Sequence, residues 1–290
     1  MAKYLIINAD DYGMSQEANE AITDLLLKKR ISSTSMMANG VCFDEAAGLA
    51  HMHHIKDIGV HLALTRDGFQ TDTPLRYSSL SGADSITKDG FLYTCRKDLE
   101  ENCIYKDLVK ECRMQYHKLL ENGVDFTHVD NHMYTLFPGL GLKGYLSALI
   151  AYDGQCSRKR RGIRFAKEGI QLEGFYEVWG GRKVRTLITP LLKIKNLVSV
   201  DRVYSFPYSS CTFQTTEDAI AYLERFLAQV PEGITELHVH PCSESDAIKK
   251  WNPTWKQRVR EYDMLLKAPL EEMLNKYHIE MTTYRELCEK

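Results

Sequence analysis

The sequence predicts an α/β protein in which mostly parallel strands curl into a (β/α) barrel-like fold. Short runs of β-branched, aromatic and other apolar residues alternate with helical patterns along the whole chain. Such alternation implies right-handed β–α–β units and a largely parallel sheet. About seven or eight units fit into the 290 residues, which favours a seven- or eight-stranded barrel that is irregular or incomplete. No repeat, low-complexity tract or linker divides the sequence, so we expect a single domain over residues 1–290.

Eight segments are expected to form strands. Each is a short run rich in apolar and β-branched side chains and bounded by polar or turn residues, as is typical of buried strands. The predicted strands are Lys3–Asn8, Ser32–Ala38, Asp57–Leu64, Phe126–Asp130, Gly162–Phe165, Arg202–Ser205, Thr235–His240 and Ile279–Thr283.

Helices are expected between these strands, where apolar residues recur every three or four positions. After the first strand, Ser15 has the side chain of an N-cap, and Ala18, Ile22 and Leu25 follow at helical spacing through Lys29. The other predicted helices are Phe43–His51, Leu108–Leu120, Val184–Ile194, Glu217–Ala228 and Trp255–Tyr277.

Two stretches lack this periodicity. Thr65–Lys106 contains several glycines and a proline, and so long an irregular segment favours a lid-like insertion. Tyr152–Arg185 contains the basic cluster Arg158–Arg161, followed by Arg164. That cluster has two interpretations. It is either a solvated loop or a contact for a phosphorylated sugar, because guanidinium groups match phosphate oxygens.

Composition excludes several classes of function. The net charge is −2, which gives no global field to attract nucleic acid or an anionic membrane. The sequence has neither a secretory signal nor the roughly 20 apolar residues of a membrane span. The eight cysteines are scattered without a C-x-x-C pair, which indicates reduced thiols and a cytoplasmic protein. A homodimer is the default expectation for its assembly.

Four polar motifs lie where predicted strands end. They are Asn8–Gly13 (NADDYG), Gly59–His61 (GVH), Thr127–His132 (THVDNH) and Glu236–Pro241 (ELHVHP). In parallel α/β folds the carboxyl ends of the strands share one face, so these side chains are expected to meet. Each motif alone has a structural explanation, since acidic pairs occur in turns and a buried histidine is often part of the core. Their joint occurrence at strand ends favours a functional site.

The residue types suit metal-assisted hydrolysis. One carboxylate and two imidazoles bind a divalent ion and leave positions open for water and substrate. The ion makes water more acidic and polarises a carbonyl, while a second carboxylate acts as general base. An acidic pair supplies both carboxylates, and a further histidine can protonate a departing amine.

With these motifs in this order, the chain resembles the YdjC-like carbohydrate deacetylases, which include the chitooligosaccharide and hopanoid-biosynthesis deacetylases. The resemblance runs from residue 3 to beyond residue 280. It implies a barrel-like fold, a divalent metal that is usually magnesium, with zinc as the alternative, and a small N-acetylated sugar such as diacetylchitobiose as substrate.

Site residues follow from the resemblance by position. The implied metal ligands are Asp11, His61 and His128, with Asp10 as general base and His240 as acid. His132 is either a ligand or part of the pocket wall, and the role of His238 is equally open. Two departures are visible: relatives often carry histidine where this chain has Tyr134, and glycine where it has Cys242.

Substrate contacts are expected from His132, Tyr12, Tyr134 and Arg164. Tyr12 and Tyr134, with Phe137 and Trp179, are candidate walls for stacking sugar rings. Two alternatives to deacetylation stay open. One is hydrolysis of a phosphate or a phosphorylated disaccharide, and the other is a non-catalytic sugar-binding protein.

Overall fold

The computed structural model describes residues 2–67, 75–154, 156–178, 180–207 and 213–289. Within this part of the chain, the main sheet has the order β8-β10-β11-β1-β2-β3-β6-β7-β9, and β12 also pairs with β1. Neighbouring strands are parallel, except that β8 and β10 are antiparallel. The strands of this sheet are β1 (Lys3–Tyr12), β2 (Ser33–Met36), β3 (Ile58–Leu62), β6 (His128–Asn131), β7 (Arg161–Ile163), β8 (Tyr176–Glu177), β9 (Leu197–Ser199), β10 (Arg202–Ser205), β11 (Gly233–Val239) and β12 (Ile279–Met281).

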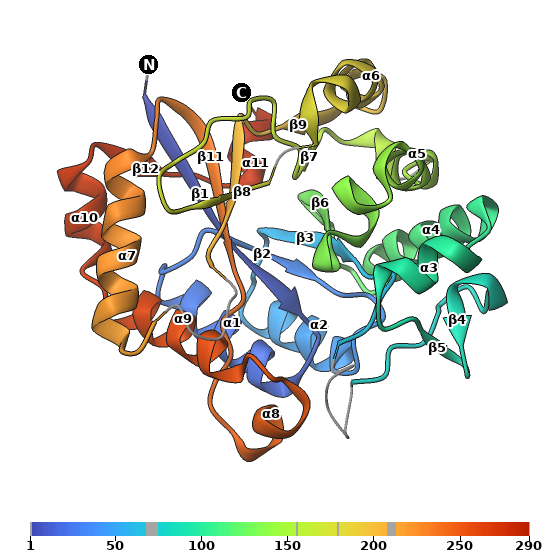
Figure 1. Ribbon diagram of the computed structural model, residues 1–290, viewed down its shortest axis with the longest axis horizontal. Coiled ribbons are helices and arrows are strands. Elements are labelled where there is room, and N and C mark those ends of the chain that lie inside the picture. The colour runs from blue at the N-terminus through green and yellow to red at the C-terminus, as the bar shows by residue number, and fades with distance from the viewer. Residues whose placement is uncertain (1, 68–74, 155, 179, 208–212, 290) are drawn as a thin grey trace.

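The sheet curls, and helices surround it (Figure 1). Among the described residues no strand pairing joins β9 to β8 or β10, so the barrel is incomplete. From residue 5 onward β1 is buried throughout, which explains why Leu5–Ile7 are apolar without alternation. The predicted α/β barrel-like fold is therefore confirmed in its incomplete form.

All eight predicted strands are present, with ends shifted by a few residues. The largest shift is in β1, which continues through the acidic pair to Tyr12. The prediction missed β8 and β9, which have only two and three residues.

The predicted helices are present as well, with one correction. Trp255–Tyr277 is two helices, because Pro269 lacks the amide hydrogen that a continuous helix needs and instead caps the second one. The helices are α1 (Gln16–Leu27), α2 (Phe43–Met52), α3 (Arg96–Asn102), α4 (Tyr105–Glu121), α5 (Gly141–Ala151), α6 (Gly181–Ile194), α7 (Thr216–Gln229), α8 (Asp246–Trp251), α9 (Trp255–Lys267), α10 (Leu270–Lys276) and α11 (Tyr284–Glu289).

Both irregular stretches contain short regular elements. Thr65–Lys106 holds the hairpin of β4 (Thr87–Lys88) and β5 (Phe91–Leu92), and then α3. Residues 68–74 of this expected lid lie outside the described part of the chain. Within the described residues, no helix has the length and apolar character to cross a membrane.

Candidate active site

The carboxyl ends of β1, β3, β6 and β11 meet beside a cavity of about 640 Å³. Its wall includes Asp11 from β1, His132 from the turn after β6, and His238 and His240 from the end of β11. As predicted, four motifs that are far apart in sequence lie together. Two clusters of polar side chains can be distinguished, one around each aspartate of the acidic pair.

The Asp11 cluster joins one carboxylate to two imidazoles and a guanidinium. The Oδ1 atom of Asp11 lies 3.2 Å from Nε2 of His61 and 2.9 Å from Nδ1 of His132. Its Oδ2 atom accepts a hydrogen bond of 2.8 Å from Nη1 of Arg258 on α9. One carboxylate oxygen therefore faces the two histidines, while the other is occupied by an arginine.

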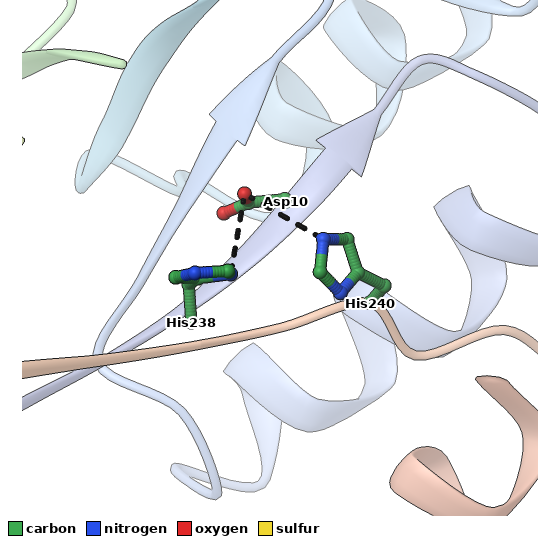
Figure 2. Close-up of side chains that lie close together, drawn as sticks. All are labelled: Asp10, His238 and His240. Carbon is green, nitrogen blue, oxygen red and sulfur yellow. Dashed lines mark ion pairs between the residues drawn. The ribbon is translucent and has the colours of Figure 1, made fainter. Parts of the chain in front are cut away.

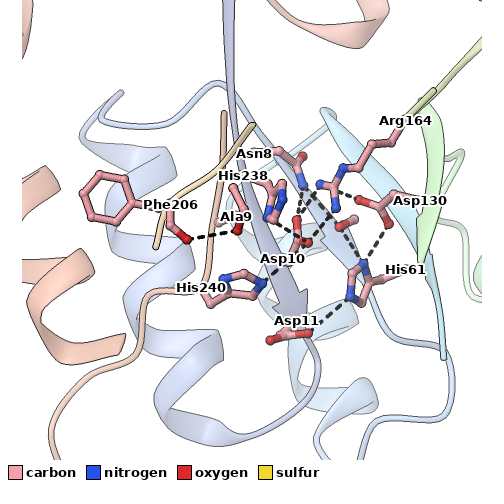
Figure 3. A network of polar contacts seen from close by, with 12 residues as sticks. Asn8, Ala9, Asp10, Asp11, His61, Asp130, Arg164, Phe206, His238 and His240 are labelled. Carbon is pink, nitrogen blue, oxygen red and sulfur yellow. Dashed lines mark hydrogen bonds and ion pairs between the residues drawn. The ribbon is translucent and has the colours of Figure 1, made fainter. Parts of the chain in front are cut away.

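A β-bulge gives the two aspartates their separate positions. Between Ala9 and Tyr12 the register of β1 against β2 shifts, and Asp11 has a left-handed φ of 73°. Consecutive residues of a regular strand point to opposite faces, whereas a bulge redirects one side chain. The left-handed conformation costs free energy in a non-glycine residue, and such strain is concentrated at functional sites. The bulge thus lets both Asp10 and Asp11 face the site (Figure 3).

The Asp10 cluster is built around Arg164, which follows β7. Its guanidinium binds both carboxylate oxygens of Asp10, each at 2.6 Å. Nδ1 of His238 and Nε2 of His240 lie 3.7 and 3.8 Å from Oδ2 of Asp10 (Figure 2). Burial alone would raise the pKa of Asp10, but the charge and hydrogen bonds of Arg164 outweigh it and hold that pKa well below its usual range.

Asp130 on β6 connects the two clusters. One of its oxygens lies 2.7 Å from Nδ1 of His61, and the other lies 2.8 Å from Arg164 (Figure 3). Arg164 also donates to Glu236 at 2.8 Å, so three buried carboxylates surround this arginine. A carboxylate that accepts the Nδ1 proton of a histidine fixes the tautomer in which Nε2 can bind a metal. Asp130 thus orients His61 toward Asp11.

The Asp11 cluster fits a divalent cation. One ligand atom each from Asp11, His61 and His132 lies within 4.8 Å of the others. Burial would lower the pKa of His61, but Asp130 and Asp10 raise it to about 10. Burial would likewise lower the pKa of His132, but Asp67 and Asp11 raise it to about 9. The negative charge of these carboxylates favours the protonated rings, and it would favour a bound metal ion for the same reason.

His128, expected as the third metal ligand, is not part of this group. It is the first residue of β6, and its ring stacks on Tyr284 with centroids 4.1 Å apart. A Cβ atom on Gly59 would lie 2.4 Å from its Nε2, so that glycine makes room for the ring. At about 3.3 Å per residue, His132 is displaced roughly 13 Å along the chain from His128 and reaches the carboxyl end of the sheet. The structure therefore brings His132, and not His128, together with Asp11 and His61.

Of the residues expected to contact substrate, some line the cavity and others are buried in the core. His132 and Tyr134 line the cavity, and the Tyr134 hydroxyl contacts Nε2 of His238. Tyr12 is fully buried, and its hydroxyl bonds Thr23, so it belongs to the core. Phe137 is also buried, stacked on Tyr145. Trp179 lies outside the described residues.

Arg164 and the residues of the basic cluster Arg158–Arg161 are not on the cavity wall. Arg164 is buried among carboxylates, and its role is to hold Asp10 in place. Arg161 begins β7, at the amino ends of the strands, where it donates to Asp125 and to backbone oxygens. Lys159 binds Asp125 as well, and Arg160 donates to the carbonyl of Cys288. The expected contact between this cluster and an anionic sugar is therefore not supported at this cavity.

His240 lies on the cavity wall, as expected of an acid that meets substrate. Its backbone N–H donates to Oε2 of Glu261 on α9 at 2.5 Å. Burial lowers the pKa of His240 to about 4, so its ring is neutral near pH 7. Burial also raises the pKa of Glu261, to about 8.

Several residues of the site were not predicted. They are Asp130, as the link between the clusters, and Asp67, Arg258 and Glu261. Asp130 lies inside a predicted motif, whereas Arg258 and Glu261 lie on a helix more than two hundred residues from Asp11 and have no local signal. Asp67 accepts from Nε2 of His132 at 2.6 Å and is the last described residue before the gap at 68–74.

Known proteins resemble this chain, one of them over nearly its whole length and others over about half of it. A carbohydrate deacetylase from Brevibacillus brevis is 23% identical over 284 residues, which cover 98% of this chain and 99% of that protein. A chitooligosaccharide deacetylase from Klebsiella pneumoniae is 30% identical over 135 residues, covering 46% of this chain and 50% of the relative. The alignments with similar deacetylases from Listeria innocua and Clostridium beijerinckii likewise span about half of each relative.

A solved structure has the same fold. It comes from Enterococcus faecalis V583, is described provisionally as a cellobiose-phosphate cleavage protein, and has 20% sequence identity. The superposition has a TM-score of 0.75 and covers 99% of this chain and 100% of the other. The sequence model of the YdjC-like protein family matches residues 4–276, nearly the whole chain. The protein therefore belongs to the YdjC-like family.

Proposed function

We propose that this protein is a metal-dependent hydrolase that removes an acetyl group from an N-acetylated oligosaccharide such as diacetylchitobiose. The observation that carries the proposal is the group of Asp11, His61 and His132, which opens on a cavity of ligand size. Relatives named carbohydrate and chitooligosaccharide deacetylases support the type of reaction. The resemblance favours magnesium, and two imidazole ligands suit zinc as well.

The metal ligands of the proposal are Oδ1 of Asp11, Nε2 of His61 and a ring nitrogen of His132. A divalent ion held there would supply Lewis acidity, which polarises the acetyl carbonyl and makes water a stronger acid. Arg258 holds the second oxygen of Asp11 and so keeps this carboxylate in a one-oxygen mode of binding. Asp130 and Asp67 orient His61 and His132 from outside the ligand group.

Asp10 is the proposed proton acceptor for the attacking water. Arg164 and Asn8 fix the orientation of its carboxylate, at the cost of making it a weak base. Nε2 of His240 lies 3.8 Å from Oδ2 of Asp10, and the lowered pKa of His240 keeps its ring neutral before the reaction. The proton that Asp10 takes from water can pass to His240, which then protonates the amine as the C–N bond breaks. Asp10 and His240 thus act in sequence on one proton.

The experiment is an acetate-release assay on N,N′-diacetylchitobiose with purified, metal-loaded protein. We expect acetate release that a chelator abolishes and that added Mg²⁺ or Zn²⁺ restores. Release of inorganic phosphate or of a shortened sugar from a phosphorylated disaccharide, without acetate, would favour the phospho-disaccharide alternative. Sugar binding by metal-loaded protein without any product would favour a non-catalytic binding protein.

A further inference from the structure

Helix α6 carries apolar side chains on two opposite sides. On the inner side, Ile188 and Leu192 are buried. The outer side is a ridge of exposed residues at spacings of four, three and four, which places them on one helix face: Lys183, Leu187, Pro190 and Ile194. Leu187 is 56% exposed and Ile194 is 77% exposed. A helix at the surface of a domain normally buries one apolar stripe and presents a polar face to water, so this outer ridge favours a binding partner.

Positive charge surrounds the ridge. No aspartate or glutamate lies between Glu177 and Asp201, whereas α6 and its C-cap carry five cations: Arg182, Lys183, Arg185, Lys193 and Lys195. Within the described chain none of the five forms an ion pair with a carboxylate, and Arg185 and Lys195 donate only to backbone carbonyls. The net charge of −2 for the whole chain therefore conceals a local excess of positive charge.

The helix lies at the outer edge of the molecule, beside α5 (Figure 1). The C-terminal ends of the two helices adjoin, because Nζ of Lys195 donates to the carbonyl of Tyr152 at 3.0 Å. Ile150, in the last turn of α5, is 44% exposed and adds a further apolar side chain near this end. The patch is separate from the candidate active site, since none of the described residues that line the cavity lies on α5 or α6.

We propose that α6 docks this protein on an anionic lipid surface, with Leu187 and Ile194 inserted at the interface and the cations among the lipid phosphates. A basic helix with an apolar face is the kind of element that lies in the plane of such an interface. The long stems of Lys183 and Lys193 let their ammonium groups stay with the head groups while neighbouring apolar side chains insert. This docking is independent of the reaction proposed for the cavity.

Two other partners fit the patch less well. A nucleic acid offers phosphates to the cations, but its backbone gives the apolar ridge nothing against which to be buried. A second copy of this chain, packed on the same face about a twofold axis, would bring two sets of five cations together, and like charges repel. A lipid interface provides both phosphates and apolar surface.

The first test is sedimentation of the purified protein with vesicles of phosphatidylcholine alone or with about one third phosphatidylglycerol. We expect binding to the mixed vesicles to be at least about tenfold stronger, because each cation near an anionic surface contributes about fivefold. Raising the salt from about 50 to 300 mM should release the protein, since exposed charges are screened. No binding to the mixed vesicles at low salt, or equal binding to both kinds, would overturn the inference.

A second test locates the charge. Lys183→Gln with Lys193→Gln should weaken binding to the mixed vesicles by about tenfold or more. The matched control is Lys28→Gln with Lys97→Gln, which removes the same charge from exposed positions on other helices and should bind like the unchanged protein. Equal losses in the two double variants would show that binding follows overall charge, and would overturn the assignment to α6.

A third test addresses the apolar ridge. Leu187→Gln with Ile194→Gln should weaken binding to the mixed vesicles about threefold to tenfold, because less apolar area leaves water. Leu27→Gln with Met52→Gln is the control, since both side chains are exposed on other helices. Urea unfolding of each variant shows that the fold is retained. Binding that depends on the lysines but not on the apolar pair would identify a general polyanion site and overturn the lipid assignment.

Discussion

Asp10 and Asp11 are consecutive, yet their surroundings differ in the feature that decides metal binding. Each carboxylate has one guanidinium and two imidazoles beside it. Arg164 binds both oxygens of Asp10, whereas Arg258 binds one oxygen of Asp11 and leaves Oδ1 facing His61 and His132. In the proposed site the coordinating oxygen is therefore on Asp11, whereas Asp10 is the carboxylate that Arg164 holds on both oxygens.

A β-bulge can thus give two adjacent side chains of the same type different surroundings. The register shift and the left-handed Asp11 separate the two carboxylates into neighbouring clusters. Asp130 then couples the clusters, because it contacts His61 on one side and Arg164 on the other.

The largest effect is expected from the Asp11 cluster. His132→Asn should remove the bound ion and lower kcat by about three to four decades, because the ion supplies several kcal/mol and about 1.4 kcal/mol is tenfold in rate. His128→Asn is the control, since His128 belongs to none of the groups of described residues that could hold an ion, which are Asp11, His61 and His132; Asp10, His238 and His240; and Asp10, His61 and Asp130. Metal content by atomic emission and kcat check both variants. Metal loss in His128→Asn with retention in His132→Asn would reverse the ligand assignment.

On the Asp10 side, Asp10→Asn should lower kcat by about two to four decades, the usual contribution of a general base, and leave the ion bound. The amide is similar in shape and can still accept from Arg164. Metal content and kcat are measured together with Asp11→Asn, which should lose the ion. If Asp10→Asn loses the ion instead and recovers turnover with added metal, the roles of the pair are exchanged.

The ion pairs of Arg164 are expected to contribute to the free energy of unfolding. Arg164→Met would leave Asp10, Asp130 and Glu236 buried without their shared cation, and removing one partner of a buried ion pair costs about 3–5 kcal/mol. We expect the free energy of unfolding in urea to fall by this order. Arg285→Met is the control, because its ion pair with Asp57 is partly exposed and is expected to contribute at most about 1 kcal/mol. Similar losses in both variants would contradict the buried network.

The smallest expected effect concerns pH. Burial raises the pKa of Glu261 to about 8, above its ordinary value of 4.5, so the folded protein holds a proton that the unfolded chain releases between these values. The contribution of this group to stability is fully present below pH 4.5 and is lost as pH rises through 8. Glu261→Gln, which keeps a neutral side chain, should flatten the decline of unfolding free energy between about pH 5 and 8. Identical pH profiles for the two proteins would show that Glu261 is not the titrating group.

Much of the fold was predictable because most of its strands are short segments rich in apolar and β-branched residues that alternate with helical patterns. The break at Pro269 shows that periodicity alone joins neighbouring helices that a proline separates. The meeting of the four motifs was predictable as well, since carboxyl ends of parallel strands share one face.

The ligand set was less predictable. Whether His128 or His132 reaches the site depends on where β6 ends, and the structure ends it at Asn131, immediately before His132. The bulge at Asp11 has no sequence signal such as glycine. Arg258 joins the site from a helix that is distant in sequence, so only the tertiary fold reveals it.

The most direct test of the central claim is an anomalous-diffraction crystal structure of the zinc-loaded protein. The account predicts one peak about 2.0–2.2 Å from Oδ1 of Asp11, Nε2 of His61 and a ring nitrogen of His132. A peak bound instead by Asp10, His238 and His240, or by His128, would contradict it.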